Sequence, residues 1–271
     1  MDKVDFRTSM QEPIQGHTSK GDQPKWHLNE KWYKADHMGY EALAEIVISR
    51  LLKRSNVLEF VTYEPVLIQH DDKEVPGCVS QNFRGKDEML IPFERLHRAY
   101  KGRGLASVLG KMEESLDRIR YTVDFVEQTT KLTGVGPYLT MLLEMDSFFL
   151  NEDRHTNNLA VLRNEKTMQF RLCPVFDNGL ALLSDLNDYP LEKDLYACIG
   201  RVQAKPFDMD FDAQVEAAES LYGSQLNFQF ERNDVTRVLA DLDELYPQEI
   251  LQRVERAIYE QMRKYPVYFC R

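Results

Sequence analysis

Two polar motifs joined by a predicted β-hairpin constrain the fold of this chain most. In the first, Asp153 precedes Asn158 by five residues, and the second begins nineteen residues further on, at Asp177 of an Asp-Asn-Gly run. The apolar runs 159–162 and 168–172 between them are short and separated by a turn-like polar stretch, which predicts two antiparallel strands. Such a hairpin would bring Asn158 and Asp177 together although they lie far apart in the sequence.

The residue types in these motifs are those that phosphoryl transfer requires. Mg²⁺ is a hard cation that prefers oxygen ligands, so an amide and a carboxylate beside the phosphates of ATP suit it. In protein kinases a first aspartate accepts the proton of the substrate hydroxyl, and an asparagine and a second aspartate hold the metal. Asp, Asn and Gly are also ordinary turn residues, and the first motif alone would fit a polar loop. The joint pattern favours a phosphotransferase site, with Asp153 as catalytic residue and Asn158 and Asp177 as Mg²⁺ ligands.

A lysine and a glutamate are expected to anchor ATP in the N-terminal part of the chain. Lys34 ends an aromatic segment that reads as a strand and precedes a helical pattern, which is where the phosphate-binding lysine of a kinase lies. Glu41 and Glu45 are four residues apart on one flank of that helix, so either could pair with Lys34. Most Lys and Glu side chains are solvated surface charges. The two motifs described above favour the functional interpretation.

Contacts to the phosphates and to adenine are expected from two further segments. The chain has neither a G-x-G-x-x-G nor a Walker A motif, and the small-residue loop before the aromatic strand is 16–25. Its glycines and lysines could form an anion-binding nest, although a generic turn has the same composition. The strand 77–83 is the expected hinge, where Gln81 and Phe83 would contact the nucleotide.

The order of predicted elements indicates an α+β fold with two lobes, of the protein-kinase type. Residues 1–15 lack periodicity and are expected to form a flexible N-terminus. A strand-rich N-lobe is expected over 16–83, with a strand pair at 26–34 that turns at Asn29-Glu30, strands at 60–69 and 77–83, and an amphipathic helix at 39–54. ATP would bind between the lobes, as ligands often do at a domain interface. A helical C-lobe holding the hairpin is expected over 84–271, with helices at 92–100, 113–132, 137–150, 212–222, 234–245 and 248–265.

The composition of the chain argues against nucleic acid and membranes as binding partners. The net charge of −10 and the dispersal of Lys and Arg among acidic residues argue against direct binding to nucleic acid. The apolar stretches 44–52 and 138–150 are interrupted by charges and too short to span a bilayer. The first twenty residues are polar, unlike a signal peptide. Cys78 and Cys173 lie in apolar runs and are expected to be small core residues. We therefore expect a cytoplasmic protein without membrane contact.

The chain resembles the HipA-like serine/threonine kinases, which are bacterial toxin-type kinases with a two-lobed, protein-kinase-like fold. Segment 21–25 is similar to that family's short G-x-Q-x-K phosphate loop. Segment 151–158 is similar to its catalytic loop, which also recurs as D-R-H-x-x-N in lipid kinases, and Phe176-Asp177 is similar to its metal-binding aspartate. The resemblance runs from about residue 16 to about residue 185. The C-terminal part is similar to the family's larger lobe only in being helical.

The resemblance implies roles for individual residues. His155 would have a structural or charge-stabilising role in the catalytic loop. A hydroxyl just before the phosphate loop, at Thr18 or Ser19, would be autophosphorylated, and the added charge would expel the loop and switch the kinase off. Hydroxyls that merely bond their own backbone in a polar turn are the alternative. The other implied residues are Gly21, Gln23 and Lys25 in the phosphate loop, Lys34 as phosphate anchor, Asp153 as base, and Asn158 and Asp177 on Mg²⁺.

The activity implied is transfer of phosphate from ATP, with Mg²⁺, to a Ser or Thr hydroxyl of a protein substrate. A small-molecule or lipid kinase is a second interpretation, because it shares the D-R-H-x-x-N loop. A catalytically silent kinase fold that binds nucleotide or a partner is a third. Family members carry a further N-terminal subdomain, which often contacts the partner in toxin–antitoxin complexes. This chain starts almost at the phosphate loop. Either a small partner or antitoxin chain supplies that part, or the protein stands alone.

Overall fold

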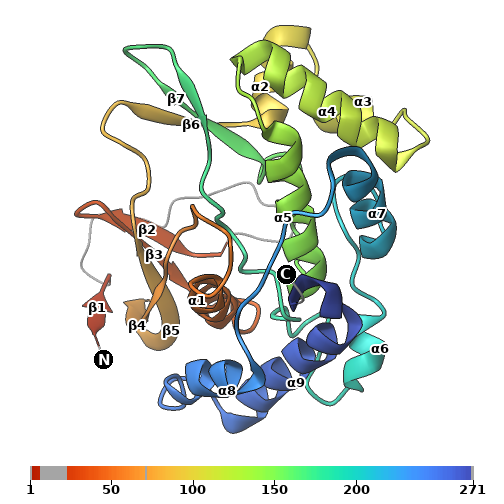
Figure 1. Ribbon diagram of the computed structural model, residues 1–271. Helices are drawn as coiled ribbons and strands as arrows, with labels where there is room; N and C mark the ends of the chain where they lie inside the picture. Colours follow the sequence, from red (N-terminus) through yellow and green to blue (C-terminus); the bar gives the residue numbers. More distant parts are fainter. Residues whose placement is uncertain (1, 7–22, 71, 270–271) are drawn as a thin grey trace.

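The protein has a two-lobed α+β fold, as its sequence predicts (Figure 1). The structure is a computed structural model that describes residues 2–6, 23–70 and 72–269. The smaller lobe is built on a five-stranded sheet in the order β1-β4-β5-β3-β2, and the larger lobe consists mainly of helices. The strands of this sheet are β1 (Lys3–Asp5), β2 (Lys25–Leu28), β3 (Lys31–Ala35), β4 (Glu64–His70) and β5 (Lys73–Gln81).

The β2–β3 hairpin confirms the strand pair that the aromatic segment predicts. Asn29 and Glu30 form its two-residue turn, with φ angles of 50° and 61°. Positive φ at both central positions is the geometry of a type I′ turn, whose twist matches that of the flanking strands. The hairpin pairs Lys25 directly with Lys34, and directly opposed residues of antiparallel strands share one face of the sheet. Both amines therefore leave the sheet on the same side.

The first residues of the chain differ from the expected flexible start. Lys3–Asp5 pair in parallel with Leu67–Gln69 of β4. Phe6 is buried and stacks on Trp26, with ring centroids 4.7 Å apart. Two apolar residues in a polar stretch are too short a pattern to predict a strand, and the partner strand lies far away in the sequence.

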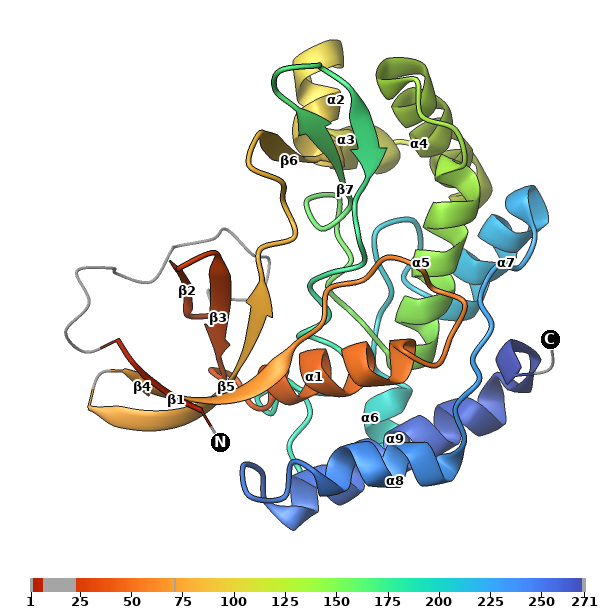
Figure 2. The same cartoon turned by 60° about the vertical axis from the view of Figure 1, so that its left-hand side comes forward.

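Helix α1 (Glu41–Leu52) was predicted to be amphipathic, but all of its residues except Arg50 are buried. The helix packs on the first sheet, mainly against β5. It also packs against α8 of the larger lobe, so neither side of the helix faces solvent. Figure 2 shows α8 and α9 running beneath α1. A local pattern does not predict this because the covering helix follows much later in the chain.

Polar contacts reinforce the packing between α1 and the C-terminal helices. Arg54, just after α1, forms an ion pair with Asp234 of α8 at 2.6 Å. Tyr246, between α8 and α9, donates a hydrogen bond of 2.8 Å to Asp36, just before α1. Both ends of α1 are thus fixed to the larger lobe, which sets the position of the helix relative to the hairpin.

The larger lobe is arranged around α5 and a second sheet, in the order β6-β7-β8. The β7–β8 hairpin and the long helices were predicted. Strand β6 was not, because helical character was expected from residue 84 onward. It lies antiparallel to β7, with Leu90 opposite Leu162. The elements are β6 (Glu88–Pro92), α2 (Phe93–Lys101), α3 (Leu105–Leu109), α4 (Ser115–Thr130), α5 (Val135–Phe149), β7 (Ala160–Asn164), β8 (Phe170–Leu172), α6 (Leu195–Ile199), α7 (Phe211–Tyr222), α8 (Arg232–Ala240), α9 (Gln248–Lys264) and a 3₁₀ turn, η1 (Pro266–Phe269).

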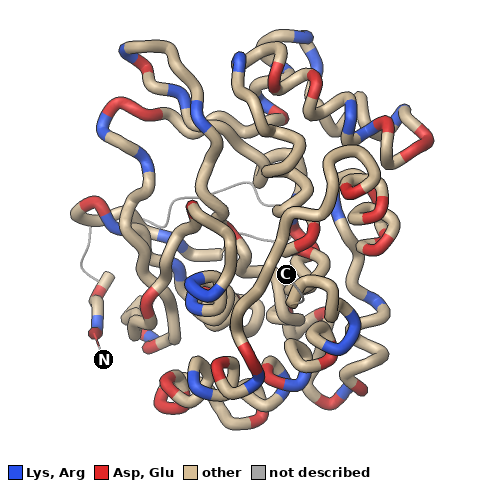
Figure 3. The backbone as a smooth tube through the Cα atoms, in the orientation of Figure 1, with Lys and Arg blue, Asp and Glu red and all other residues tan. Residues whose placement is uncertain are grey.

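One hydrophobic core joins the two lobes, with residues from α1, α4, α5, α7, α8 and α9. A smaller core, which includes Trp26 and Ile68, belongs to the first sheet. Positive and negative residues are interspersed over both lobes (Figure 3). No helix in the described part of the chain combines the length and the apolar character needed to cross a bilayer.

Candidate active site

The predicted catalytic loop follows α5, and most of its residues are buried. Leu150 ends the helix with a φ of 58°, in the left-handed region, and turns the chain toward the loop. The Nδ2 of Asn158 donates to the backbone oxygen of Asp153 at 2.8 Å and to its Oδ2 at 3.4 Å. Asp153 and Asn158 are 6% and 8% exposed. The five-residue spacing thus closes a loop in which the Asn158 side chain holds the backbone of Asp153.

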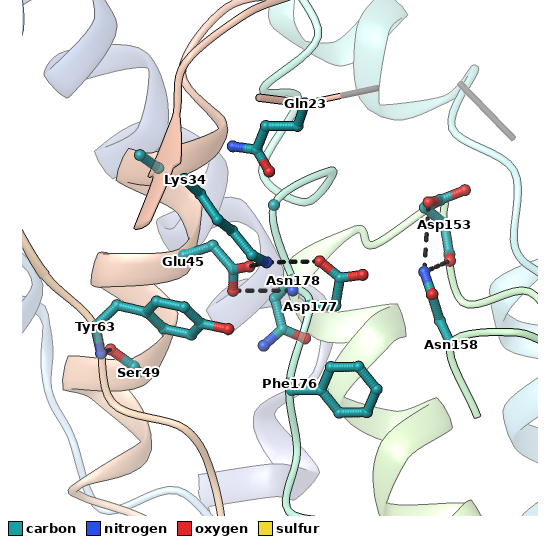
Figure 4. Close-up of polar contacts among 12 residues, drawn as sticks. Gln23, Lys34, Glu45, Ser49, Tyr63, Asp153, Asn158, Phe176, Asp177 and Asn178 are labelled. Carbon is teal, nitrogen blue, oxygen red and sulfur yellow. Dashed lines mark hydrogen bonds and ion pairs between the residues drawn. The ribbon is translucent and has the colours of Figure 1, made fainter. Parts of the chain in front are cut away.

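Asp177 lies between Lys34 and the Asp153–Asn158 pair (Figure 4). It follows β8, so the hairpin carries it toward the catalytic loop as predicted. Its φ is 60°, a conformation that Asp tolerates better than most residues. Backbone conformations of this kind are frequent at functional sites, where the surrounding structure maintains them.

The structure separates the two candidate partners of Lys34. The Lys34 Nζ lies 2.5 Å from the Oε1 of Glu45 and 2.7 Å from the Oδ1 of Asp177. The other oxygen of Glu45 accepts the backbone N–H of Asn178 at 2.9 Å. Glu41 instead accepts three backbone N–H groups, those of residues 37–39, at 2.7–3.2 Å. Glu45 is therefore the partner of Lys34, and Glu41 binds the turn that precedes α1.

Electrostatics favours the ionised forms of Lys34 and Asp177. Burial acts to lower the pKa of Lys34, but Asp177 and Glu45 together raise it well above its ordinary value. Burial acts to raise the pKa of Asp177, but Lys34, followed by Lys25 and Arg154, holds it well below its ordinary value. Asp177 is thus a carboxylate at neutral pH, which is the form that a metal ligand requires.

A cavity of about 30 Å³ lies between Asp153 and Asp177. Gln23 and Lys25, at the described end of the predicted phosphate loop, line it together with Gly179. The Gln23 Nε2 donates to the backbone oxygen at the end of β3 at 3.0 Å, which fixes this side chain over the site. The other residues predicted for this segment lie outside the described residues: Thr18, Ser19 and Gly21.

The predicted hinge, 77–83, comprises the end of β5 and the two residues after it, and it borders the same region. Phe83 lies beyond the end of the strand, and its ring centroid is 5.5 Å from that of Phe176. Both rings pack against a small buried cluster that includes Leu162 of β7. Gln81 is the last residue of β5, pairs with Lys31 and is exposed. Phe83 and Phe176 therefore supply apolar surface close to Asp177, as a site for a flat ring requires.

The side-chain oxygen atoms of Asn158 and Asp177 are suited to bind Mg²⁺. Among the described residues, no donor binds the Oδ1 of Asn158 or the Oδ2 of Asp177, because their hydrogen bonds use the other atoms of each group. The described part of the chain has no cluster of three or more His, Cys, Asp or Glu side chains able to hold a metal. Mg²⁺ commonly uses one or two carboxylates, waters and substrate phosphates. Asn158 and Asp177 are thus the residues that would hold it.

Arg154 is a residue of the site that the sequence did not identify. It is 1% exposed, and its guanidinium binds both carboxylate oxygens of Asp146 on α5, each at 2.9 Å. It also donates to the backbone oxygen of Phe176 at 2.9 Å and to the Oδ1 of Asn178 at 2.7 Å. These two acceptors flank Asp177, so Arg154 ties the predicted catalytic loop to the segment that carries Asp177. One sequence feature could have pointed to Arg154. Asp146 lies inside the apolar pattern of α5, and a buried charge requires a partner.

Two basic side chains flank the Asp153 carboxylate. The Nε2 of His155 is 3.8 Å from Oδ2, and the backbone N–H of His155 donates to the Asp153 carbonyl at 2.8 Å. Lys205, from the segment between α6 and α7, has its Nζ 3.6 Å from Oδ1. His155 was predicted to support this loop, whereas no pattern in the sequence pointed to Lys205.

A double-mutant cycle should couple Lys34 to Glu45 and not to Glu41. We expect a coupling of about 0.5–3 kcal/mol in the free energy of unfolding between Lys34→Met and Glu45→Gln, because the two side chains are in direct contact. The Lys34→Met and Glu41→Gln pair should be additive within about 0.5 kcal/mol. Urea unfolding of the three single variants, the two double variants and the wild type measures both values. Equal coupling in the two cycles would contradict the assignment.

The two lobes, the hairpin and the buried Lys34–Glu45 pair define a protein-kinase-like fold of the HipA type. The chain is similar to the crystal structure of the Helicobacter pylori proinflammatory kinase CtkA, with 15% identity and a TM-score of 0.63 over 97% of this chain and 94% of that chain. It is also similar to Shewanella oneidensis HipA, solved with HipB and operator DNA, with 11% identity and a TM-score of 0.53 over 97% of this chain and 68% of that chain. No protein-family model and no curated protein matches the sequence. The resemblance inferred from the motifs is thereby confirmed for the fold.

Proposed function

We propose that this protein is a kinase that uses ATP and Mg²⁺ to phosphorylate a Ser or Thr hydroxyl of a protein. The observation that carries the proposal is the double contact of Lys34, to Glu45 at 2.5 Å and to Asp177 at 2.7 Å. In an active kinase the Lys–Glu ion pair and the metal-binding aspartate must both be in place. The fold shared with CtkA, which is described as a kinase, supports the same activity.

On the nucleotide side, the chain's residues bind and orient ATP. Lys34, oriented by Glu45, binds phosphate oxygens, as does Lys25, which leaves the same face of the sheet. Phe83 and Phe176 enclose the adenine ring in the proposed complex. Mg²⁺, when bound, neutralises charge on the phosphates.

On the acceptor side, Asp153 accepts the proton of the hydroxyl at a carboxylate oxygen. Its backbone is held by Asn158 at 2.8 Å, so the carboxylate has a fixed direction. Catalysis of this type rests mainly on positioning and charge stabilisation. The buried hydrogen bonds of the catalytic loop supply that positioning before any ligand binds.

The proposal is tested by incubating the protein with γ-labelled ATP and Mg²⁺ and following both ADP formation and protein-bound label. Mass spectrometry then identifies the residues that carry phosphate. Label on Ser or Thr of the enzyme or of an added protein, absent from the Asp153→Asn variant, is the expected result. Label only on a small hydroxyl compound or a lipid would favour a different acceptor class. No ADP and no label would contradict the proposed activity.

Asp177→Asn should weaken binding of Mg²⁺·ATP by at least about tenfold, the lower end of the loss seen when even outer-shell partners of metal ligands are removed. The amide cannot supply the anionic oxygen that the cation prefers. Isothermal titration with Mg²⁺ and with EDTA measures the effect, and the wild type should show a Mg²⁺-dependent gain that the variant lacks. Asp87→Asn, at a surface residue paired with Lys166, is the control. Equal affinities of wild type and Asp177→Asn with Mg²⁺ would contradict the metal assignment.

Regulation and partners are part of the same proposal. A phosphate on Thr18 or Ser19, just before the predicted phosphate loop in the sequence, would add about −1.5 to −2 charges at pH 7, so the modified enzyme should bind ATP poorly. The mass spectrometry described above detects such a phosphate. The HipA neighbour was solved with HipB, which supports a partner chain for this protein as well.

A further inference from the structure

The segment between α6 and α7 is held firmly beside the catalytic loop. Phe207 is fully buried, its backbone N–H donates to the Oε1 of Gln214 at 2.9 Å, and its carbonyl accepts from Arg118 at 2.6 Å. Ala204 is also buried and is hydrogen-bonded within the segment. Lys205 lies between these two anchored residues. Its backbone is therefore fixed, and its position near Asp153 does not depend on a mobile loop.

Lys205 brings a positive charge to the catalytic carboxylate. Its Nζ is 3.6 Å from the Oδ1 of Asp153, and the side chain is 36% exposed. This separation is too long for a hydrogen bond but gives an appreciable electrostatic attraction. Lys34 is already engaged with Glu45 and Asp177 on the nucleotide side. A second cation, beside Asp153, is therefore placed to stabilise the phosphoryl group from the acceptor side during transfer.

A polar cavity of about 880 Å³ opens on the far side of Lys205. Its lining includes Glu152, the neighbour of Asp153, and apolar residues such as Leu150 and Phe211. Glu152 accepts a hydrogen bond from the Tyr189 hydroxyl at 2.8 Å, which orders this wall. The volume is typical of a ligand site and much larger than the cavity between Asp153 and Asp177. Lys205 thus lies between a pocket large enough to bind a ligand and the carboxylate of Asp153.

We infer that this pocket receives the hydroxyl-bearing segment of the acceptor protein, and that Lys205 is a further catalytic residue at its inner end. The inference rests on the kinase activity proposed above. Five carboxylates and three cationic side chains line the pocket. An excess of negative charge attracts neutral or basic segments and repels acidic ones. The acceptor is therefore a neutral or basic segment that carries Ser or Thr.

The transfer step assigns Lys205 a charge-stabilising role. The acceptor oxygen bonds to the γ-phosphorus of ATP as the bond from that phosphorus to the bridging oxygen breaks, and ADP leaves with the electron pair. The hydroxyl proton passes to Asp153. Lys205 gives up no proton, and its ammonium group stabilises the negative charge on the phosphoryl oxygens during the transfer.

The first test compares Lys205→Ala with Lys193→Ala, an exposed lysine outside the pocket. The assay uses γ-labelled ATP with myelin basic protein as the basic acceptor and dephosphorylated casein as the acidic one. ADP is measured in parallel, so kcat is obtained whether phosphate goes to the added protein, the enzyme or water. Lys205→Ala should lower kcat by about 10²–10³-fold, as loss of a charge-stabilising group does, with the KM for ATP within twofold. Lys205→Arg should restore part of the rate, and Lys193→Ala should match the wild type.

The second test blocks the pocket and needs no nucleotide. Met209 lines the cavity and is 64% exposed, whereas Met168, 56% exposed, lies on the β7–β8 turn. Met209→Trp should weaken binding of fluorescently labelled myelin basic protein at least fivefold in anisotropy titrations without ATP, and Met168→Trp should not. It should also raise the KM for this acceptor without changing that for ATP.

The outcomes separate this inference from the proposed function. A wild type that turns over ATP, with Lys205→Ala as fast as Lys193→Ala, overturns the role of Lys205 and leaves the kinase activity standing. A higher KM for ATP at unchanged kcat would make Lys205 a nucleotide anchor and also overturns it. Equal binding by the two Trp variants, or a preference for casein, overturns the pocket assignment. A wild type that forms no ADP contradicts the kinase activity, and with it this inference.

Discussion

Replacing Asp153 with Asn should lower phosphoryl transfer by about 10²–10⁴-fold, the usual contribution of a positioned acid–base group, while ATP affinity stays within about twofold. The amide has nearly the shape of the carboxylate, but it cannot accept the proton of the hydroxyl. The backbone of residue 153 should remain in position because Asn158 holds its carbonyl at 2.8 Å, a contact independent of the substituted side chain. The loss should therefore appear in kcat and not in nucleotide binding.

Single-turnover transfer and isothermal titration with ATP measure the two quantities separately. Asp243→Asn, on the exposed surface between α8 and α9, removes one carboxylate elsewhere and should leave both unchanged. A tenfold loss of ATP affinity in Asp153→Asn would mean that this residue binds the metal or the phosphates. Full activity in the variant would exclude Asp153 as the base.

The parts of the site that could be predicted from the sequence are those set by local spacing. The Asp153–Asn158 loop closes through a contact within five residues, and a hairpin carries Asp177 to it, so a short stretch of sequence contains most of the geometry. The role of Lys34 could be predicted in the same way, from its position at the end of a predicted strand. Strands β1 and β6 were missed because each is short and pairs with a strand far along the chain.

The remaining features depend on tertiary packing. Glu41 and Glu45 lie on the same flank of α1, and only the positions of Lys34 and the backbone at 37–39 decide which of them binds the lysine. The burial of α1 on all sides depends on α8, which lies almost two hundred residues later. Lys205 reaches Asp153 from the α6–α7 segment, which carries no recognisable motif. Contacts of this kind leave no periodic or short-range pattern in a single sequence.

The largest loss of stability is expected from Arg154→Ala. Removing one partner of a buried ion pair commonly costs about 3–5 kcal/mol, because the other charge is left buried and uncompensated. Here Asp146 would lose both of its bonds to the guanidinium, and the acceptors at Phe176 and Asn178 would lose their donor. Urea unfolding measures the effect. Arg120→Ala, which removes an exposed ion pair with Asp117, is the matched control and should cost no more than about 1 kcal/mol.

A second variant separates stability from positioning. Arg154→Met combined with Asp146→Leu removes both charges, and apolar replacement of a buried pair is often neutral for stability or better. The double variant should therefore recover much of the stability that Arg154→Ala loses. Its phosphoryl transfer should stay impaired, because the guanidinium no longer ties the catalytic loop to the residues on either side of Asp177. If the recovered stability came with full activity, Arg154 would be only a structural residue. If Arg154→Ala cost no more than Arg120→Ala, the buried network would not hold the two segments together.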